Sequence, residues 1–189
     1  YSGADLLARH GADSVFGLVT ARGGKTAPNS TSAGGASGNG NAGGTGAGGT
    51  WGNGGAGAGA AGNAQSPGIG IISNISGTSL EYGGGGDGSQ NQSSGSPRDG
   101  AGTHSTGTGS LDKPALANRG GGGSQRANDS FNGGAGGSGV VIVRYNSSDQ
   151  TTTACSPDST TASNGDTILT FTTPGTCDWT VPTGILSSS

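Results

Sequence analysis

Glycine recurs at every third position from Gly40 to Gly55 without a gap. A period of three is that of a polyproline II type helix, which has three residues per turn and rises about 3.1 Å per residue. Glycine at each turn leaves one edge of the helix without side chains, so that another helix can approach closely. Collagen has the same period but needs about 15–20% proline, and the chain has no proline between Pro28 and Pro67. The positions predicted to pack are Gly40, Gly43, Gly46, Gly49, Gly52 and Gly55.

The composition indicates a fold that depends on backbone contacts more than on side chains. Glycine supplies 45 of the 189 residues, hydrophobic residues 28% and charged residues 10%, with a formal net charge of −3. So few large aliphatic residues would normally predict disorder, but disordered chains usually carry a high charge. We therefore expect a bundle of polyglycine II helices, with a flexible Gly/Ser linker as the alternative.

Short strands are predicted to complete a mainly β and irregular fold with essentially no α-helix. One strand is expected over 14–21, and two extended pieces over 67–82 around a turn at Ser76-Gly77. Residues 140–145 begin with four aliphatic residues without polar alternation, which predicts a strand buried on both faces. At the C-terminus, 167–172 and 178–181 are expected to form a β-hairpin that turns at Pro174-Gly175.

A change of composition after the strand at 140–145 divides the chain. Residues 1–145 form the predicted glycine-rich domain of polyglycine II helices and strands. Residues 146–166, rich in Thr and Ser, are expected to be a linker, and 167–189 contain the C-terminal hairpin. The chain begins with Tyr1, so it is expected to be a mature or excised piece of a longer product.

Three segments resemble the glycine-rich domains of bacterial surface proteins and of phage tail-fibre or adhesin proteins. They are, in order, SVFGLVTARGG, GIISNISGTSLEYGGGGDG and GGAGGSGVVIVRY. A fourth segment, LTFTTPGTCDWTVPTG, resembles the strand pair that opens such a domain, yet here it follows the closing strand. This order predicts one period of a tandem repeat, or a subunit whose strands are completed by the next copy. The resemblance also implies bundled polyglycine II helices.

The expected function is that of an extracellular structural subunit of a bacterial surface filament, assembled from copies of itself by head-to-tail strand donation. An exposed sheet edge offers main-chain hydrogen bonds in a fixed register, and a contact that does not close on itself propagates as a fibre. The predicted donor residues are Ile168, Leu169, Phe171, Trp179 and Val181. The predicted acceptor residues are Val140, Val141, Ile142, Val143 and Tyr145.

Two other functions stay open at this point. A phage tail-fibre or adhesin module would use the polar loops of 87–119 to bind a host-cell or glycan receptor, and its location would be the virion tail or the cell surface. Ice binding by a flat polyglycine bundle is the third possibility.

The two cysteines, Cys155 and Cys177, predict a disulfide in a secreted protein. The bond would tie the linker to the hairpin. Closing a loop of this length stabilises a small unit by about 3 kcal/mol in the chain-entropy model. Two free thiols in a cytosolic protein are the alternative.

The sequence offers little support for an enzyme, a cofactor or a metal site. Gly23-Gly24-Lys25-Thr26 resembles the end of a phosphate-binding loop, but the glycine that the motif needs earlier is replaced by Val19. His10 and His104, the only histidines, have no partners at metal-ligand spacing. The small net charge gives no argument for nucleic acid. No apolar run approaches the roughly 18 residues of a membrane span.

Overall fold

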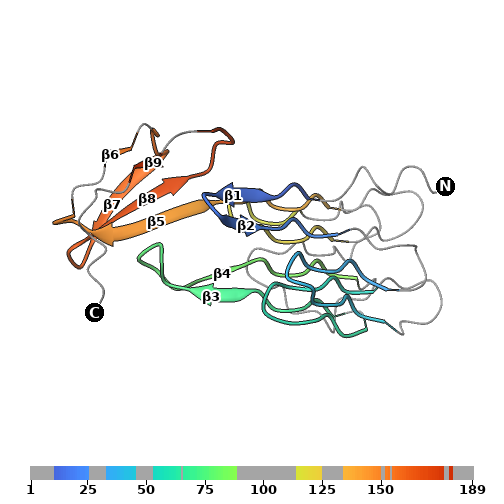
Figure 1. The fold of residues 1–189 in the computed structure, drawn as a ribbon. Coiled ribbons are helices and arrows are strands. Elements are labelled where there is room, and N and C mark those ends of the chain that lie inside the picture. The colour runs from blue at the N-terminus through green and yellow to red at the C-terminus, as the bar shows by residue number, and fades with distance from the viewer. Residues whose placement is uncertain are drawn as a thin grey trace. The chain divides into compact units, whose positions relative to one another are not determined.

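The computed structural model describes residues 11–25, 33–45, 53–64, 66–88, 114–124, 134–149, 152–153, 155–176 and 179–180. These residues contain no helix and only short strands in small antiparallel sheets, so the predicted mainly β and irregular fold is confirmed. Figure 1 labels the strands. They are β1 (Ser14–Phe16), β2 (Val19–Ala21), β3 (Ile71–Ser73), β4 (Leu80–Tyr82), β5 (Val141–Asn146), β6 (Thr152–Thr153), β7 (Ser159–Ser163), β8 (Asp166–Phe171) and β9 (Trp179–Thr180).

The chain folds into two compact units. Unit 1 comprises Tyr1–Ile72 and Leu80–Gly139, and unit 2 comprises Ser73–Ser79 and Val140–Ser189. Unit 1 contains the glycine-rich segments, and unit 2 contains the sheet of β5, β8 and β7. The division therefore falls just before the strand that the sequence places at the end of the glycine-rich domain.

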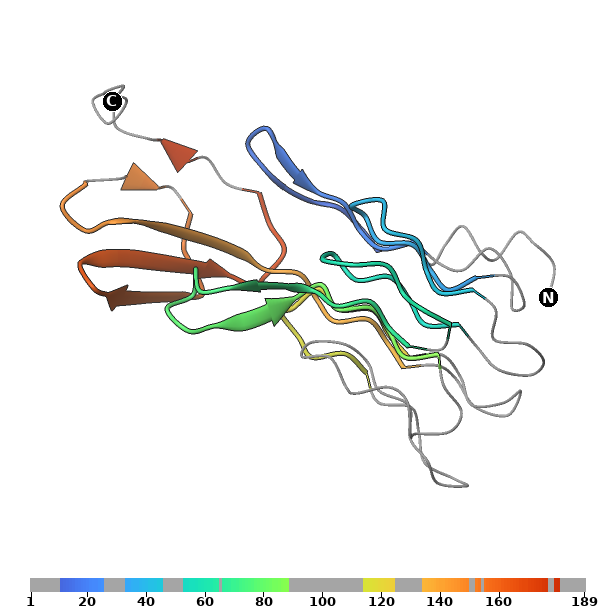
Figure 2. The ribbon, with the colours of Figure 1, turned by 90° about the horizontal axis from the view of Figure 1, so that it is seen from below.

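In unit 1, extended segments of about five residues run side by side without forming a β-ladder (Figures 1 and 2). Several of them bury every third residue. A helix with three residues per turn returns the same face to its neighbours at that interval, so these segments have the period of polyglycine II helices. The buried pairs are Gly34 with Ser37, Gly54 with Gly57, and Gly121 with Ser124.

Backbone hydrogen bonds join four of these segments in a row with a ten-residue stagger. The amide of Gly34 donates to the carbonyl of Gly44 at 2.9 Å, and the amide of Gly44 donates to that of Gly54 at 2.8 Å. The amide of Gly54 continues the row to the carbonyl of Ala64 at 2.7 Å. The chain therefore folds back at regular intervals and satisfies its own polar backbone, as buried amides and carbonyls require.

Other bonds close a ring of three neighbouring segments. The amide of Gly55 donates to the carbonyl of Gly86 at 2.8 Å, and the amide of Gly68 donates to that of Gly55 at 2.8 Å. The amide of Gly85 then donates to the carbonyl of Gly68 at 2.9 Å. Each segment is thus bonded to both of the others, in directions that do not share one plane. Unit 1 is therefore a bundle rather than a sheet.

The close approach of the backbones explains why these positions are glycine. A Cβ atom on Gly34 would overlap the carbonyl oxygen of Gly54, and one on Gly86 would overlap that of Gly123. The segment 84–88 is buried at every residue. Interiors of proteins are already close-packed, so this core has no room for side chains along these contacts.

The predicted run of six packing glycines is interrupted. Gly40 lies in a turn with a φ of +89°, and a Cβ atom there would meet nothing within 4 Å. The amide of Gly40 donates to the carbonyl of Ser37 at 3.1 Å, which folds the chain back on itself. Gly43 and Gly55 do lie against neighbouring backbone, but in two different segments. Gly46, Gly49 and Gly52 lie outside the described residues.

Two strand pairs extend from the bundle within unit 1. The single strand predicted over 14–21 is wrong, because β1 and β2 pair with each other around Gly17-Leu18. Gly17 has a φ of +58°, which a residue without Cβ adopts at little cost. The two extended pieces predicted over 67–82 are present as β3 and β4. The turn between them is closed by the amide of Gly77, which donates to the carbonyl of Asn74.

Unit 2 is organised around β8, which lies between β5 and β7 in an antiparallel sheet. The hairpin partner predicted for 167–172 is wrong. The hairpin is formed by β7 and β8, and β9 pairs instead with β6. The turn is Asn164-Gly165, with φ angles of 52° and 84°, and two positive φ values characterise the tight turn that matches the twist of paired strands. The predicted linker therefore contains β6 and β7.

Among the described residues, the core of unit 2 consists of Cys155 and two adjacent residues on the central strand. Ile168 is 1% exposed and Leu169 is 4% exposed, and neighbouring residues in a strand point to opposite faces. On the Ile168 face, a Cβ atom on Gly77 would lie 3.4 Å from the Ile168 Cδ1 atom, so the segment Ser73–Ser79 covers this side chain. The expectation that the strand at 140–145 is buried on both faces is wrong, because β5 is half-buried and, within the described part of the chain, lies at the edge of its sheet.

Candidate assembly surfaces

The predicted donor and acceptor strands pair with each other in the same chain. β5 and β8 are antiparallel over six residue pairs, in which Val141 lies opposite Phe171 and Val143 opposite Leu169. The predicted donor and acceptor residues therefore do pair, but they pair within one copy of the chain. Of the remaining predicted residues, Ile142, Tyr145 and Ile168 also belong to this pair of strands, Val140 precedes β5, Trp179 lies opposite Thr153, and Val181 lies outside the described residues.

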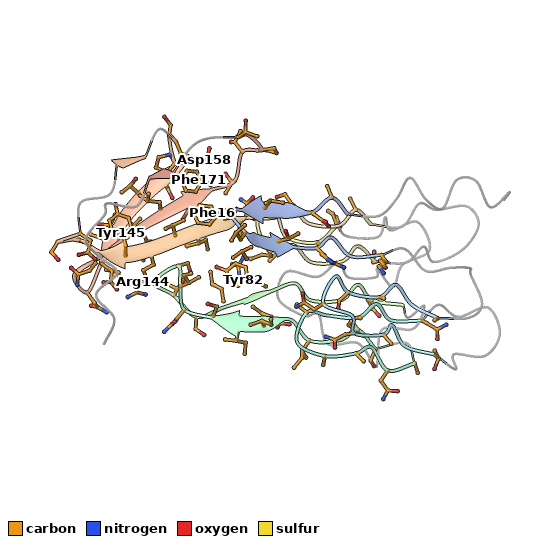
Figure 3. The ribbon with its side chains drawn as sticks, in the orientation of Figure 1. Phe16, Tyr82, Arg144, Tyr145, Asp158 and Phe171 are labelled. Atoms are coloured by element: carbon orange, nitrogen blue, oxygen red, sulfur yellow. The ribbon has the colours of Figure 1, made fainter. Side chains whose placement is uncertain are left out.

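An ion pair fixes one end of the sheet. The Nε atom of Arg144 donates to the Oδ2 atom of Asp166 at 2.7 Å, with both side chains about one quarter exposed. The Nη1 atom of Arg144 also donates to the carbonyl of Asn74 at 3.3 Å. Arg144 thereby joins β5 to β8 and to the covering segment Ser73–Ser79. Figure 3 shows Arg144 and Tyr145 at this end of the sheet.

A carboxylate fixes the opposite end, where Figure 3 shows Asp158 and Phe171. Asp158 accepts hydrogen bonds from the backbone amides of Thr172 at 2.6 Å and Thr173 at 3.0 Å, and from the Oγ1 hydroxyl of Thr173 at 2.8 Å. These bonds, led by that from the Thr172 amide, hold the pKa of Asp158 below its usual range. The charged form therefore clamps the segment before β7 to the end of β8.

The sheet of unit 2 has an exposed outer strand. Among the described residues, β7 is bonded to β8 on one side only. Its residues are Ser, Thr and Ala without charge or proline, and Ser159, Thr160, Thr161 and Ala162 are exposed. An edge of this kind presents backbone donors and acceptors to another strand, and proteins often protect such edges with charge or proline.

The apolar hairpin, which we define as β1, β2 and the turn between them, is a surface that the sequence reasoning missed. Leu18 at its tip is fully exposed, Val19 is 69% exposed and Val15 is 62% exposed. The prediction of a single strand over 14–21 did not place these side chains at the tip of an exposed hairpin. The sequence feature that indicates a hairpin is Gly17, because glycine can adopt the positive φ that a two-residue turn requires. In the same unit, Ile71 and Ile72 of β3 are also exposed.

Cys155 is buried and disulfide-bonded. It lies just before β7, at the start of the unit 2 hairpin. Cys177, the other cysteine of the chain, lies outside the described residues.

Reactive groups do not cluster in the described part of the chain. No three His, Cys, Asp or Glu side chains come together there as metal ligands. Nor does any helix in that part have the length and apolar character needed to cross a membrane. His10 and His104 lie outside the described residues.

Comparison with known proteins agrees with the division of the structure. The family model of the glycine-rich domain matches residues 2–146, which is more than half of the chain and ends at the last residue of β5. No curated protein and no solved structure matches the chain. The family match thus covers unit 1 from residue 2 onward, together with the segment Ser73–Ser79 and strand β5 of unit 2, and the protein belongs to the glycine-rich domain family.

Proposed function

We propose that the protein is a structural subunit of an extracellular fibre in which copies join head to tail. The observation that carries the proposal is the bundle of unit 1, whose interior consists mainly of glycine backbone with a few small or polar buried side chains. Where the glycines meet, a Cβ atom would overlap a neighbouring carbonyl. A body of this kind has hydrogen bonds in several directions and few rotatable groups, which suits a rigid spacer.

The pairing of β5 with β8 supplies a means of joining copies. If 147–189 of one copy cross to the next, β8 can form the same six residue pairs with the neighbour's β5. The register is preserved, because a slip of one residue would turn Ile168 and Leu169 to the wrong faces. Exchange of an identical element is a low-cost route to assembly, and it propagates when it does not close. Strand donation is thus proposed as exchange of strands that also pair within one copy.

A cross-linking experiment tests this exchange. Ile142 lies opposite Thr170, and directly opposite residues have Cβ atoms close enough for a disulfide after small shifts. One preparation carries Ile142→Cys and a second carries Thr170→Cys, and the two are mixed under oxidising conditions. Exchange predicts a cross-linked pair containing one chain of each kind.

The matched control replaces the first preparation with Leu116→Cys, an exposed residue of unit 1. Mixed cross-links at the control level would refute strand exchange. Electron micrographs of the full chain and of a variant lacking 150–189 complete the test. Filaments of normal appearance from the truncated variant would contradict the proposal.

The receptor-binding alternative depends on the loops of 87–119, of which 89–113 lie outside the described residues. It stays a prediction, to be tested by binding of the isolated protein to cells or glycans. Ice binding stays a prediction as well, and measurement of thermal hysteresis tests it.

A further inference from the structure

The apolar hairpin consists of two three-residue strands and lacks the charge and proline by which many proteins protect exposed strands. Residues 14–21 contain no charge and no proline, and the nearest charged residues are Asp13 and Arg22. Among the described residues, β2 pairs as a strand only with β1, so its outer edge has no strand partner there. An uncovered apolar strand edge presents backbone donors and acceptors with which another strand can pair.

The exposed apolar area of the hairpin is a substantial part of what a specific contact needs. The large hydrophobic side chains of this region are between about two-fifths and fully exposed. Together they expose on the order of several hundred Å², at or above the largest patch of a typical monomer. A specific interface buries about 800 Å² on each partner. These side chains are Val15, Phe16, Leu18 and Val19.

The same chain contains a complementary edge. The exposed outer strand β7 is uncharged, as the apolar hairpin is, so neither surface would bury an unpaired charge on contact. Thr160 lies opposite Leu169 and three residues before the end of β7. Counting from the two-residue turn, this is a non-hydrogen-bonded pair, so the amide of Thr160 points away from β8 and toward an added strand.

We propose that the apolar hairpin of one copy docks on the β7 edge of a second copy and extends its sheet. The inference rests on the proposed function, since it adds a second contact between the copies of the proposed fibre. The two surfaces are different parts of the chain, so the contact is heterologous. When two copies pair through it, one hairpin and one β7 edge stay available for further copies. Backbone pairing sets the register, and burial of Leu18 and Val19 supplies affinity.

Sedimentation velocity of the full chain over a concentration series tests the contact. The double variant Leu18→Asn with Val19→Thr removes the exposed apolar tip without touching a buried residue. We expect its association constant to fall at least about tenfold, because burying one large aliphatic side chain contributes more than a factor of ten. Leu116→Asn, at a residue that is 56% exposed outside the hairpin, is the matched control and should associate like the original chain.

Thr160→Pro tests the other partner of the contact. Proline removes the outward amide of β7 and leaves its bonds to β8, as edge strands tolerate. We expect the same loss of association, with the thermal transition of unit 2 retained. Thr160→Lys, which adds a charge at the same exposed position, checks the result if the proline variant unfolds.

The inference would be overturned if the chain stays monomeric over the whole concentration range. It would also be overturned if the Leu18→Asn, Val19→Thr double variant associates normally, or if both Thr160 variants associate normally. Failure of the proposed function gives a different pattern. If the mixed cross-links form and the hairpin variants still assemble, strand exchange is supported and the hairpin contact is refuted. Hairpin-dependent association that yields only closed dimers in micrographs would refute the fibre and keep the hairpin contact.

Discussion

The two units exclude water from their interiors in different ways. In unit 1, backbone lies against backbone, and amides of one glycine segment donate to carbonyls of the next. In unit 2, the central strand buries Ile168 and Leu169 on its two faces. The bundle should therefore be sensitive to atoms added where two backbones touch, whereas the sheet should be sensitive to atoms removed from its core.

The largest effect is expected for truncation of the side-chain core. Ile168→Ala leaves a cavity beneath the segment Ser73–Ser79 and should lower the free energy of unfolding of unit 2 by about 4 kcal/mol, within the range for buried Ile to Ala. Hydrogen exchange measured by mass spectrometry separates the units. Protection should be lost in β5, β7 and β8 and kept in 53–57 and 84–88. Equal loss in both units would show that they do not unfold separately.

A methyl group added to the bundle should have the next largest effect. Gly86→Ala places a Cβ atom on the carbonyl of Gly123. Because both groups belong to the backbone, the clash cannot be relieved by a side-chain rotation, and the loss should be about 3 kcal/mol, the upper end for overpacking. Gly24→Ala is the control, since its Cβ atom would lie 3.9 Å from the nearest atom, the carbonyl oxygen of Ala36. Thermal unfolding that shifts equally in both variants would rule out tight backbone packing at Gly86.

A smaller effect is expected at the turn that joins β7 to β8. Gly165→Ala puts a Cβ atom on a residue with a φ of 84° and should cost about 1–2 kcal/mol. Gly175→Ala, in the turn predicted from the sequence, should change little, because nothing lies within 4 Å and its φ is not in the left-handed region. Urea unfolding of the two variants compares the turns directly. A greater loss at Gly175 would favour the hairpin predicted from the sequence.

The smallest effect concerns pH and unit 2 alone. The folded pKa of Asp158 lies below its ordinary value of 3.8, so its contribution to stability is present above that value and is lost as the pH falls below it. Asp158→Asn removes this contribution at neutral pH and should flatten the dependence of the melting temperature between about pH 5 and pH 2. An unchanged slope in the variant would assign the acid sensitivity to other carboxylates.

Much of the fold could be predicted because it depends on local composition. The strands at 141–146 and 166–171 follow from runs of aliphatic and β-branched residues. The partners of those strands could not be predicted in the same way. Pro174-Gly175 and Asn164-Gly165 are both turn signals. The hairpin predicted from the sequence turns at Pro174-Gly175, although Asn-Gly is the stronger hairpin signal. The apolar hairpin was not predicted, because an apolar run with one internal glycine has a composition that also fits a single strand.

The sequence by itself determined that this chain could not form an ordinary side-chain core, because nearly a quarter of its residues are glycine. It also determined the period of three, since only residues without Cβ permit helices to touch along one edge. The tertiary structure decided where the helices end. Gly40 continues the period in the sequence but lies in a turn, because the chain folds back there to bond with itself. It also decided that β8 pairs with β5 of the same chain, since strand partners depend on contacts that are distant in sequence.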